Sequence, residues 1–120
     1  MKRINGRGPK SKGREFENEI RAIFLAAFPQ LDQNDITARA MGDPGCDLLL
    51  SPVARKLLPF SFELKRTERL KIAEAMAQAQ ANAKKDGEMA CIISRKNRSE
   101  PFVILRLADL IKLLGGLHGL

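Results

Sequence analysis

The sequence contains no tryptophan, no tyrosine and a single histidine, and these absences exclude several classes of function. All six aromatic residues are phenylalanines in apolar segments, where a hydrophobic core would take them. Proteins that bind single strands without sequence preference present exposed aromatic side chains for stacking, so contact with the backbone of a duplex is favoured and RNA recognition is disfavoured. The one histidine, His118, has no Ser/His/Asp or Cys/His arrangement around it, which argues against nucleophilic hydrolase chemistry.

The chain also has only two cysteines and no long hydrophobic run. Cys46 and Cys91 are far apart and lack the C-x-x-C spacing or histidine partners of a zinc site, so we expect reduced thiols. The longest apolar run, residues 22–28, is too short to span a membrane, and no secretory apolar segment follows the basic N-terminus. We therefore expect a soluble cytoplasmic protein with no membrane partner.

Positive charge is concentrated at the N-terminus. The net charge is +7, and the first fourteen residues contain six basic side chains and no acidic one. These side chains are Lys2, Arg3, Arg7, Lys10, Lys12 and Arg14. Because glycines and Pro9 interrupt them, we expect residues 1–13 to form a flexible arm that binds nucleic-acid phosphates, with a solubilising tail as the alternative. The remaining residues, 14–120, are enough for a single domain with its own core.

Hydrophobic periodicity predicts an α/β fold with an open mixed sheet flanked by helices, in the order α-β-β-β-α-β-β-α. The predicted helices cover residues 14–28, 68–85 and 107–114, the last ending at two glycines. The predicted strands cover residues 35–41, 47–50, 60–66, 89–94 and 102–105. The first three strands are expected to form a meander, with residues 51–59 as a loop between the second and the third.

The third predicted strand carries the strongest functional signal. Its apolar residues, Phe60, Phe62 and Leu64, alternate with polar ones, so Glu63 and Lys65 stand on the same face about 7 Å apart. Upstream, Asp47 begins an apolar strand behind a turn rich in glycine and proline. An aspartate on one strand and Glu-x-Lys on the next indicate a metal-dependent phosphodiesterase site, because phosphodiester hydrolysis needs carboxylates to hold a hard cation. The alternatives are a surface ion pair for Glu63 and Lys65 and a strand cap for Asp47.

At this point the chain resembles a known family. Lys12-Gly13-x-x-x-Glu17, then Asp47, Glu63-x-Lys65 and Gln78 on the following helix are similar in order and spacing to the PD-(D/E)XK nuclease superfamily. Within it, the compact size and the Lys-Gly-x-x-x-Glu opening resemble archaeal-type Holliday-junction resolvases and their small phage relatives. The resemblance implies a restriction-endonuclease-like fold.

The resemblance and the chemistry together give each site residue an expected role. Asp47, Glu63 and the carbonyl of Leu64 are expected to bind Mg²⁺, with Mn²⁺ as a substitute. By resemblance, Lys65 orients the attacking water or stabilises the developing charge, and Glu17 reaches the metal or its water. Gln78 completes the candidate catalytic set, although it could be a solvated polar residue, just as Glu17 could complement the helix dipole.

The sequence departs from the superfamily pattern at one position. The superfamily often has proline directly before the metal-binding aspartate, whereas here Cys46 precedes Asp47, and Asp43 precedes Pro44 as a rival. We favour Asp47 because a side chain on a strand is held more rigidly than one in a turn.

We therefore expect a Mg²⁺-dependent DNA endonuclease that cuts branched DNA such as four-way junctions. The alternatives are a nuclease for flaps or nicked duplexes, and a DNA-binding module without activity. Beyond the basic arm, the expected DNA contacts are Ser61, Arg66, Arg95, Lys96 and Arg98. Because a four-way junction is two-fold symmetric and must be cut on two strands, we expect a homodimer.

Overall fold

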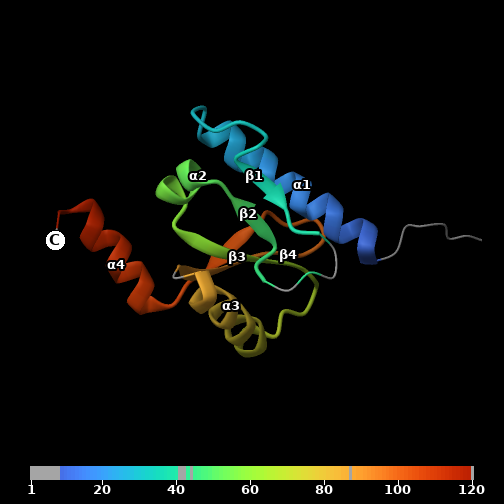
Figure 1. Ribbon diagram of the computed structural model, residues 1–120. Helices are drawn as coiled ribbons and strands as arrows, with labels where there is room; N and C mark the ends of the chain where they lie inside the picture. Colours follow the sequence, from blue (N-terminus) through green and yellow to red (C-terminus); the bar gives the residue numbers. More distant parts are fainter. Residues whose placement is uncertain (1–8, 41–42, 44, 87, 120) are drawn as a thin grey trace, which may run out of the picture.

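The structure is a computed structural model that describes residues 9–40, 43, 45–86 and 88–119 (Figure 1). Its helices are α1 (Pro9–Ala27), α2 (Pro52–Leu57), α3 (Ile72–Asp86) and α4 (Leu107–Leu117). Its strands are β1 (Ile36–Ala38), β2 (Leu48–Leu50), β3 (Phe60–Arg66), β4 (Met89–Arg95) and β5 (Phe102–Ile104). The predicted order of elements is confirmed apart from α2, and the predicted α/β class is confirmed.

The five strands form two sheets rather than one. Strands β1 and β2 pair antiparallel, while β3 pairs parallel with β4, which pairs antiparallel with β5. The predicted meander is therefore wrong at its third strand. The reason is α2, which occupies residues expected in a loop: Ser51 caps it by accepting a hydrogen bond from the Ala54 N–H, and Pro52 suits its first turn. This helix redirects the chain, so β3 pairs with β4 instead of extending the ladder of β2.

Helix α1 begins at Pro9, five residues before its predicted start. The expected flexible arm is therefore wrong for residues 9–13, which are helical, while residues 1–8 lie outside the described part of the chain. Proline is compatible with a first helical turn, and a single interior glycine such as Gly13 costs only about 1 kcal/mol. For the same reason α4 continues through Gly115 and Gly116, where the sequence predicted its end.

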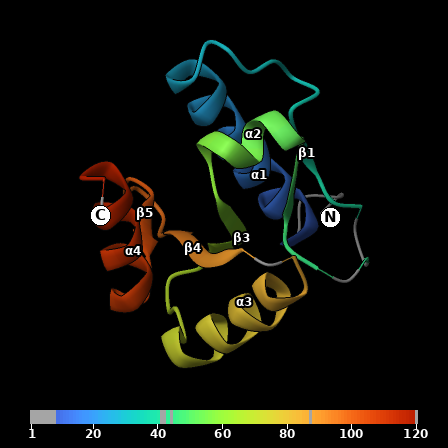
Figure 2. The same ribbon diagram turned by 60° about the vertical axis from the view of Figure 1, so that its left-hand side comes forward.

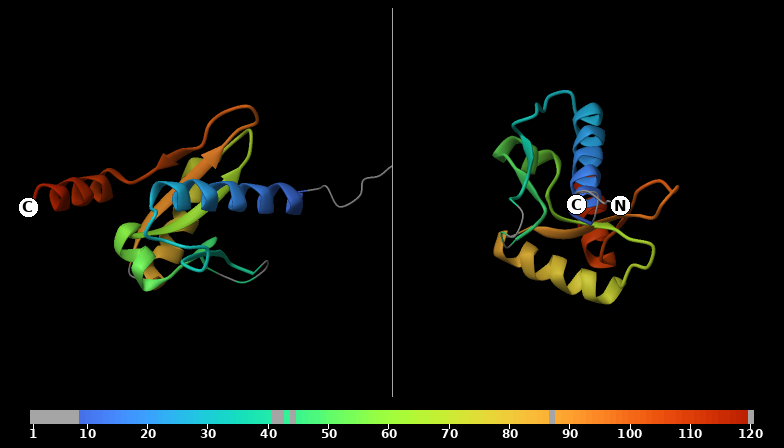
Figure 3. Two further views of the ribbon diagram at one scale, coloured as in Figure 1. Left: turned by 90° about the horizontal axis from the view of Figure 1, so that it is seen from above. Right: turned by 90° about the vertical axis from the view of Figure 1, so that its right-hand side faces the viewer.

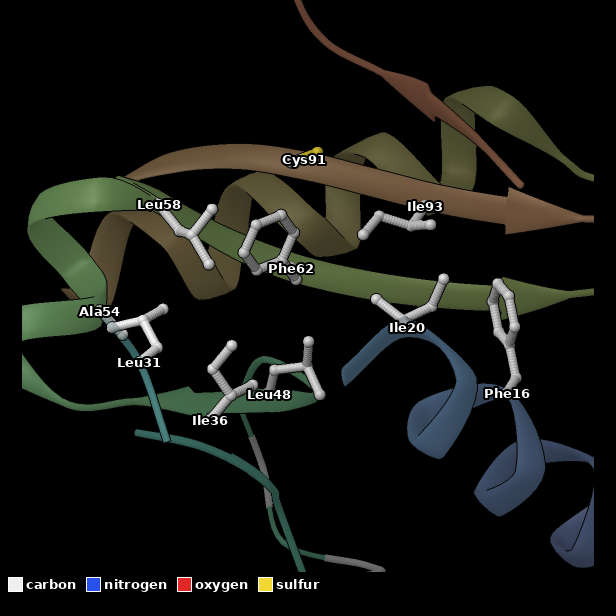
Figure 4. Close-up of a cluster of buried hydrophobic side chains, with 10 residues drawn as sticks. All are labelled: Phe16, Ile20, Leu31, Ile36, Leu48, Ala54, Leu58, Phe62, Cys91 and Ile93. Atoms are coloured by element: carbon white, nitrogen blue, oxygen red, sulfur yellow. The ribbon is translucent and has the colours of Figure 1, made fainter. Parts of the chain in front are cut away.

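The main core lies between α1 and the two sheets (Figure 4). Its buried members are Phe16, Ile20, Leu31, Ile36, Leu48, Ala54, Leu58, Phe62, Cys91 and Ile93. Phe60 and Leu64 pack against this cluster, as the alternation along β3 predicted. Figure 2 shows α3 on the opposite side of β3 and β4 from α1.

A second buried cluster joins α3 to the sheet. It consists of Ala75, Ala79 and Ala83 from α3 with Ala90 and Ile92 from β4. Such small side chains allow the helix to lie close to the strands, which buries the polar face of β3 as well as its apolar face.

Two further predictions can be compared with the fold. Cys46 and Cys91 are buried and form no disulfide, as expected. Across the described residues, every helix is too short or too polar to cross a membrane.

Candidate active site

Asp47 joins the two sheets at the start of β2. Its backbone N–H donates to the carbonyl of Phe62 at 2.9 Å, and its carboxylate Oδ2 accepts from the N–H of Leu64 at 2.7 Å. Because the N–H and the carbonyl of one strand residue point to the same edge, the Leu64 carbonyl also faces Asp47. This edge of β3, opposite to β4, therefore brings a carboxylate and a backbone oxygen together.

Glu63 lies on the face of β3 that α3 covers, and only 1% of it is exposed. Its Oε1 accepts a hydrogen bond from the Asn82 amide of α3 at 2.6 Å, and its carboxyl group lies close enough to that of Asp47 for each to shift the pKa of the other. Burial raises the pKa of Glu63, and the charge of Asp47 raises it further. The two predicted ligands are thus electrostatic neighbours, since the charge of one disfavours ionisation of the other.

The pKa values of Asp47 and Glu17 are raised as well. Burial raises the pKa of Asp47, against the opposing hydrogen bond from Leu64 and the charge of Lys65. The pKa of Glu17 is raised by burial first and by the charge of Asp47 second, so Glu17 lies within the electrostatic reach of the site. Since α1 begins at Pro9, Glu17 is far from the helix N-terminus, which removes the alternative that it serves the helix dipole.

Lys65 and Gln78 are brought together as the predicted set requires. The Lys65 Nζ donates to the Gln78 Oε1 at 3.1 Å. Gln78 is exposed, so this hydrogen bond lies at the solvent-accessible surface of α3. It stands four residues before Asn82 on α3, so one helix face supplies an amide to both Lys65 and Glu63.

The residues of the site fit a hard divalent cation. Two carboxylates and one carbonyl are oxygen ligands of the kind that Mg²⁺ takes while it keeps several waters. Among residues 9–40, 43, 45–86 and 88–119, no three acidic, cysteine or histidine side chains gather closely enough to hold a metal ion by themselves. Glu17 thus contributes charge near Asp47 without completing a three-acid cluster, and the rival Asp43 is exposed.

Sequence reasoning missed two residues at this site. Asn82 is one of several polar residues on α3, and its type alone does not single it out. Its spacing of four from Gln78 places both side chains on the same helix face, which could have indicated it. Arg39 donates from Nε to the Cys46 carbonyl at 2.6 Å, and its charge favours the ionised form of Asp47. A side chain at Gly45, whose φ is 120°, would come within 2.8 Å of the Arg39 guanidinium, so only glycine suits that turn. Nothing in the sequence marks Arg39.

Some of the predicted DNA contacts are exposed, and others are engaged by neighbouring side chains. Arg14, Lys96 and Arg98 are exposed. Arg66 donates to the Asn97 side chain at 2.7 Å, and Arg95 forms an ion pair with Glu19 of α1. Lys10 and Lys12 lie in α1, whereas Lys2, Arg3 and Arg7 fall outside the described residues.

Ser61 does not support its expected role as a phosphate contact. Its side chain is fully buried beneath α3, and its Oγ has no hydrogen-bond partner. A phosphate group cannot reach a side chain without exposed surface, so the residue serves packing in this conformation.

The fold and this site define the class to which the chain is similar. The architecture is that of a restriction-endonuclease-like α/β domain, with an acidic pair and a lysine at the junction of its sheets. It resembles the solved structure of Hjc, a Holliday junction resolvase from the archaeal hyperthermophile Archaeoglobus fulgidus, with a TM-score of 0.52. The two chains are 18% identical, and the match covers 78% of this chain and 72% of that one. The resemblance expected from the sequence is thereby confirmed for the fold.

Comparison by sequence adds nothing to this likeness. No protein-family model matches the chain, and no curated protein matches it significantly.

Proposed function

We propose that the protein is a Mg²⁺-dependent DNA endonuclease that resolves four-way junctions. The observation that carries the proposal is the convergence of Asp47, Glu63 and the edge of β3 at Leu64, with Lys65 on the same strand. The resolvase-like fold supports the same assignment.

Each residue has a distinct task in this proposal. Asp47, Glu63 and the Leu64 carbonyl hold Mg²⁺ or Mn²⁺, which when bound neutralises developing charge and activates water. Lys65, held by Gln78, orients the attacking water and stabilises charge on the phosphate. Glu17 adds negative charge beside Asp47, which favours a cation there.

Basic side chains supply the DNA contacts. Lys96 and Arg98 are exposed in the turn between β4 and β5, and Arg14 is exposed on α1. The charged residues 1–13 add further phosphate contacts, which position a duplex without reading its sequence. Arg95 makes a weaker candidate, because Glu19 and the Ser99 carbonyl already engage its guanidinium.

The second cut requires a second copy of the chain, and an apolar surface is available for it. Helix α4 extends away from the body of the molecule (Figure 3), and its large apolar side chains are exposed together with two on the edge strand β5. They are Phe102, Val103, Leu107, Leu110, Ile111, Leu114 and Leu117. The five on α4 recur at the spacing of one helix face, and monomers rarely expose large apolar patches. The near lack of charge on this surface favours an identical partner over DNA, and a two-fold arrangement matches the symmetry of the junction.

A cleavage assay tests this proposal. Purified protein is incubated with a four-way junction, a flap, a nicked duplex and a linear duplex, each with Mg²⁺ and with chelator. We expect Mg²⁺-dependent cleavage of the junction at paired positions, with much slower cleavage of linear duplex. Equal cutting of all substrates would indicate a less selective nuclease, and tight binding without any cleavage would indicate a DNA-binding module.

A further inference from the structure

Helix α3 presents two amide side chains to the polar face of β3. Gln78 and Asn82 are one helical turn apart, and their partners Lys65 and Glu63 are two residues apart on the strand. Four residues of helix rise about 6 Å and two residues of strand about 6.6 Å, so the two spacings match. Helix α3 is therefore aligned with β3 so that the Gln78–Lys65 and Asn82–Glu63 hydrogen bonds form together.

We infer that Asn82 is a positioning residue for Glu63: its amide fixes Oε1 of the carboxylate and thereby aims the other oxygen at the metal position beside Asp47. This inference rests on the proposed function. Gln78 belongs to the catalytic set expected from the sequence, whereas Asn82 is a new assignment.

The surroundings of Asn82 show that packing does not require an amide there. The residues that α3 buries against the sheet are alanines, including Ala79 and Ala83 beside Asn82. An alanine at position 82 would continue that pattern and has the highest helix propensity. A polar side chain at this position instead supplies a donor to a carboxylate that is 1% exposed.

The hydrogen bond limits the conformations open to Glu63. A glutamate side chain has several rotatable bonds, so a buried carboxylate without a partner could adopt more than one rotamer. The bond at 2.6 Å holds Oε1 toward α3. Groups that orient metal-binding carboxylates in this way typically change metal affinity or activity by about 10 to 100-fold when removed.

The test uses Asn82→Leu, which keeps the volume and removes the donor, and Asn82→Ala as a second variant should leucine prevent folding. The control is Gln80→Leu, at an exposed position of the same helix. Two quantities are measured: the rise in melting temperature of the DNA-free protein during Mg²⁺ titration, and kcat and KM for junction cleavage at several Mg²⁺ concentrations.

We expect the Asn82 variants to need at least about tenfold more Mg²⁺ for half of the thermal shift. We also expect a lower kcat, with KM for the junction within about twofold, and wild-type behaviour for Gln80→Leu. An unchanged Mg²⁺ requirement in both Asn82 variants would overturn the inference, even where their melting temperatures fall. A wild-type protein that binds Mg²⁺ without cleaving would refute the proposed function and leave the thermal shift to decide on Asn82. A wild-type protein that binds no Mg²⁺ would overturn both.

Discussion

The carboxylate of Asp47 accepts a hydrogen bond from the backbone N–H of Leu64 at 2.7 Å, across the boundary between two sheets. Strands β2 and β3 belong to different sheets, so here the Leu64 N–H donates to a side-chain carboxylate instead of to the backbone carbonyl of a neighbouring strand. The strand edge that would have been saturated by a neighbouring strand instead faces a carboxylate. The junction of the sheets is therefore the place where the chain can gather oxygen ligands.

Removing a metal-binding carboxylate should abolish cleavage while sparing DNA binding. We expect Asp47→Asn and Glu63→Gln each to lower kcat by at least about a thousandfold, because each loses a ligand charge, with junction affinity within about tenfold of wild type. Gel-shift and cleavage assays measure both quantities. Asp43→Asn is the matched control and should cleave normally; loss of activity there instead would make Asp43 the ligand.

The substitution Glu63→Gln should stabilise the metal-free protein at neutral pH. Burial raises the pKa of Glu63 above its ordinary value of 4.5, so the folded chain loses stability as pH rises from that value through the raised pKa. Glu63→Gln has no such loss, and its amide oxygen can still accept from Asn82. We expect its melting temperature in chelator at pH 8 to exceed that of wild type by at least about 2 °C.

The pH series supplies the control for that stability prediction. The difference in melting temperature should narrow toward pH 4, where the wild-type carboxyl group is protonated. Added Mg²⁺ should stabilise wild type more than the variant. A difference that does not change with pH would show that Glu63 titrates normally.

Shortening the basic N-terminus should reduce the salt dependence of DNA binding. Residues 1–8 carry Lys2, Arg3 and Arg7, and each phosphate contact contributes ~0.9 to the slope of log affinity against log salt. We expect deletion of these residues to flatten the slope by about one to three units, with little change in kcat at saturating DNA. Lys96→Gln, which removes one exposed charge, should change it by about one unit at most. An unchanged slope after the deletion would leave these residues as a solubilising tail.

A charge on the exposed face of α4 should separate the proposed dimer. Ile111 is 58% exposed, and Ile111→Glu would place a carboxylate in an apolar interface at little cost to the monomer. Light scattering at micromolar concentration should give twice 13.3 kDa for wild type and 13.3 kDa for the variant. Val53→Glu, at an apolar residue of α2 that is 53% exposed, should remain dimeric. Wild-type protein that stays monomeric with junction DNA would favour a nuclease that nicks one strand at a time.

The sequence predicted the elements whose signals are local. The alternation along β3 gave the faces of Phe62 and Glu63, and helical spacing gave α1 and α3, because period and burial are coupled within one segment. It placed the start of α1 at residue 14, whereas the helix begins at Pro9. Proline breaks the interior of a helix but is compatible with its first turn. Sequence reasoning also missed α2, a helix of six residues that is too short to show a period.

Alone, the sequence determined the order of elements apart from α2 and which acidic and basic residues could form a site, since these depend on residue type and spacing. Tertiary structure decided that β2 and β3 part into different sheets, that Asp47 bridges them, and that α3 covers Glu63 and supplies Asn82. Those relationships depend on contacts between segments that are 17 and 19 residues apart. Local propensity carries no information about such contacts, because packing of the whole core selects the register in which distant segments meet.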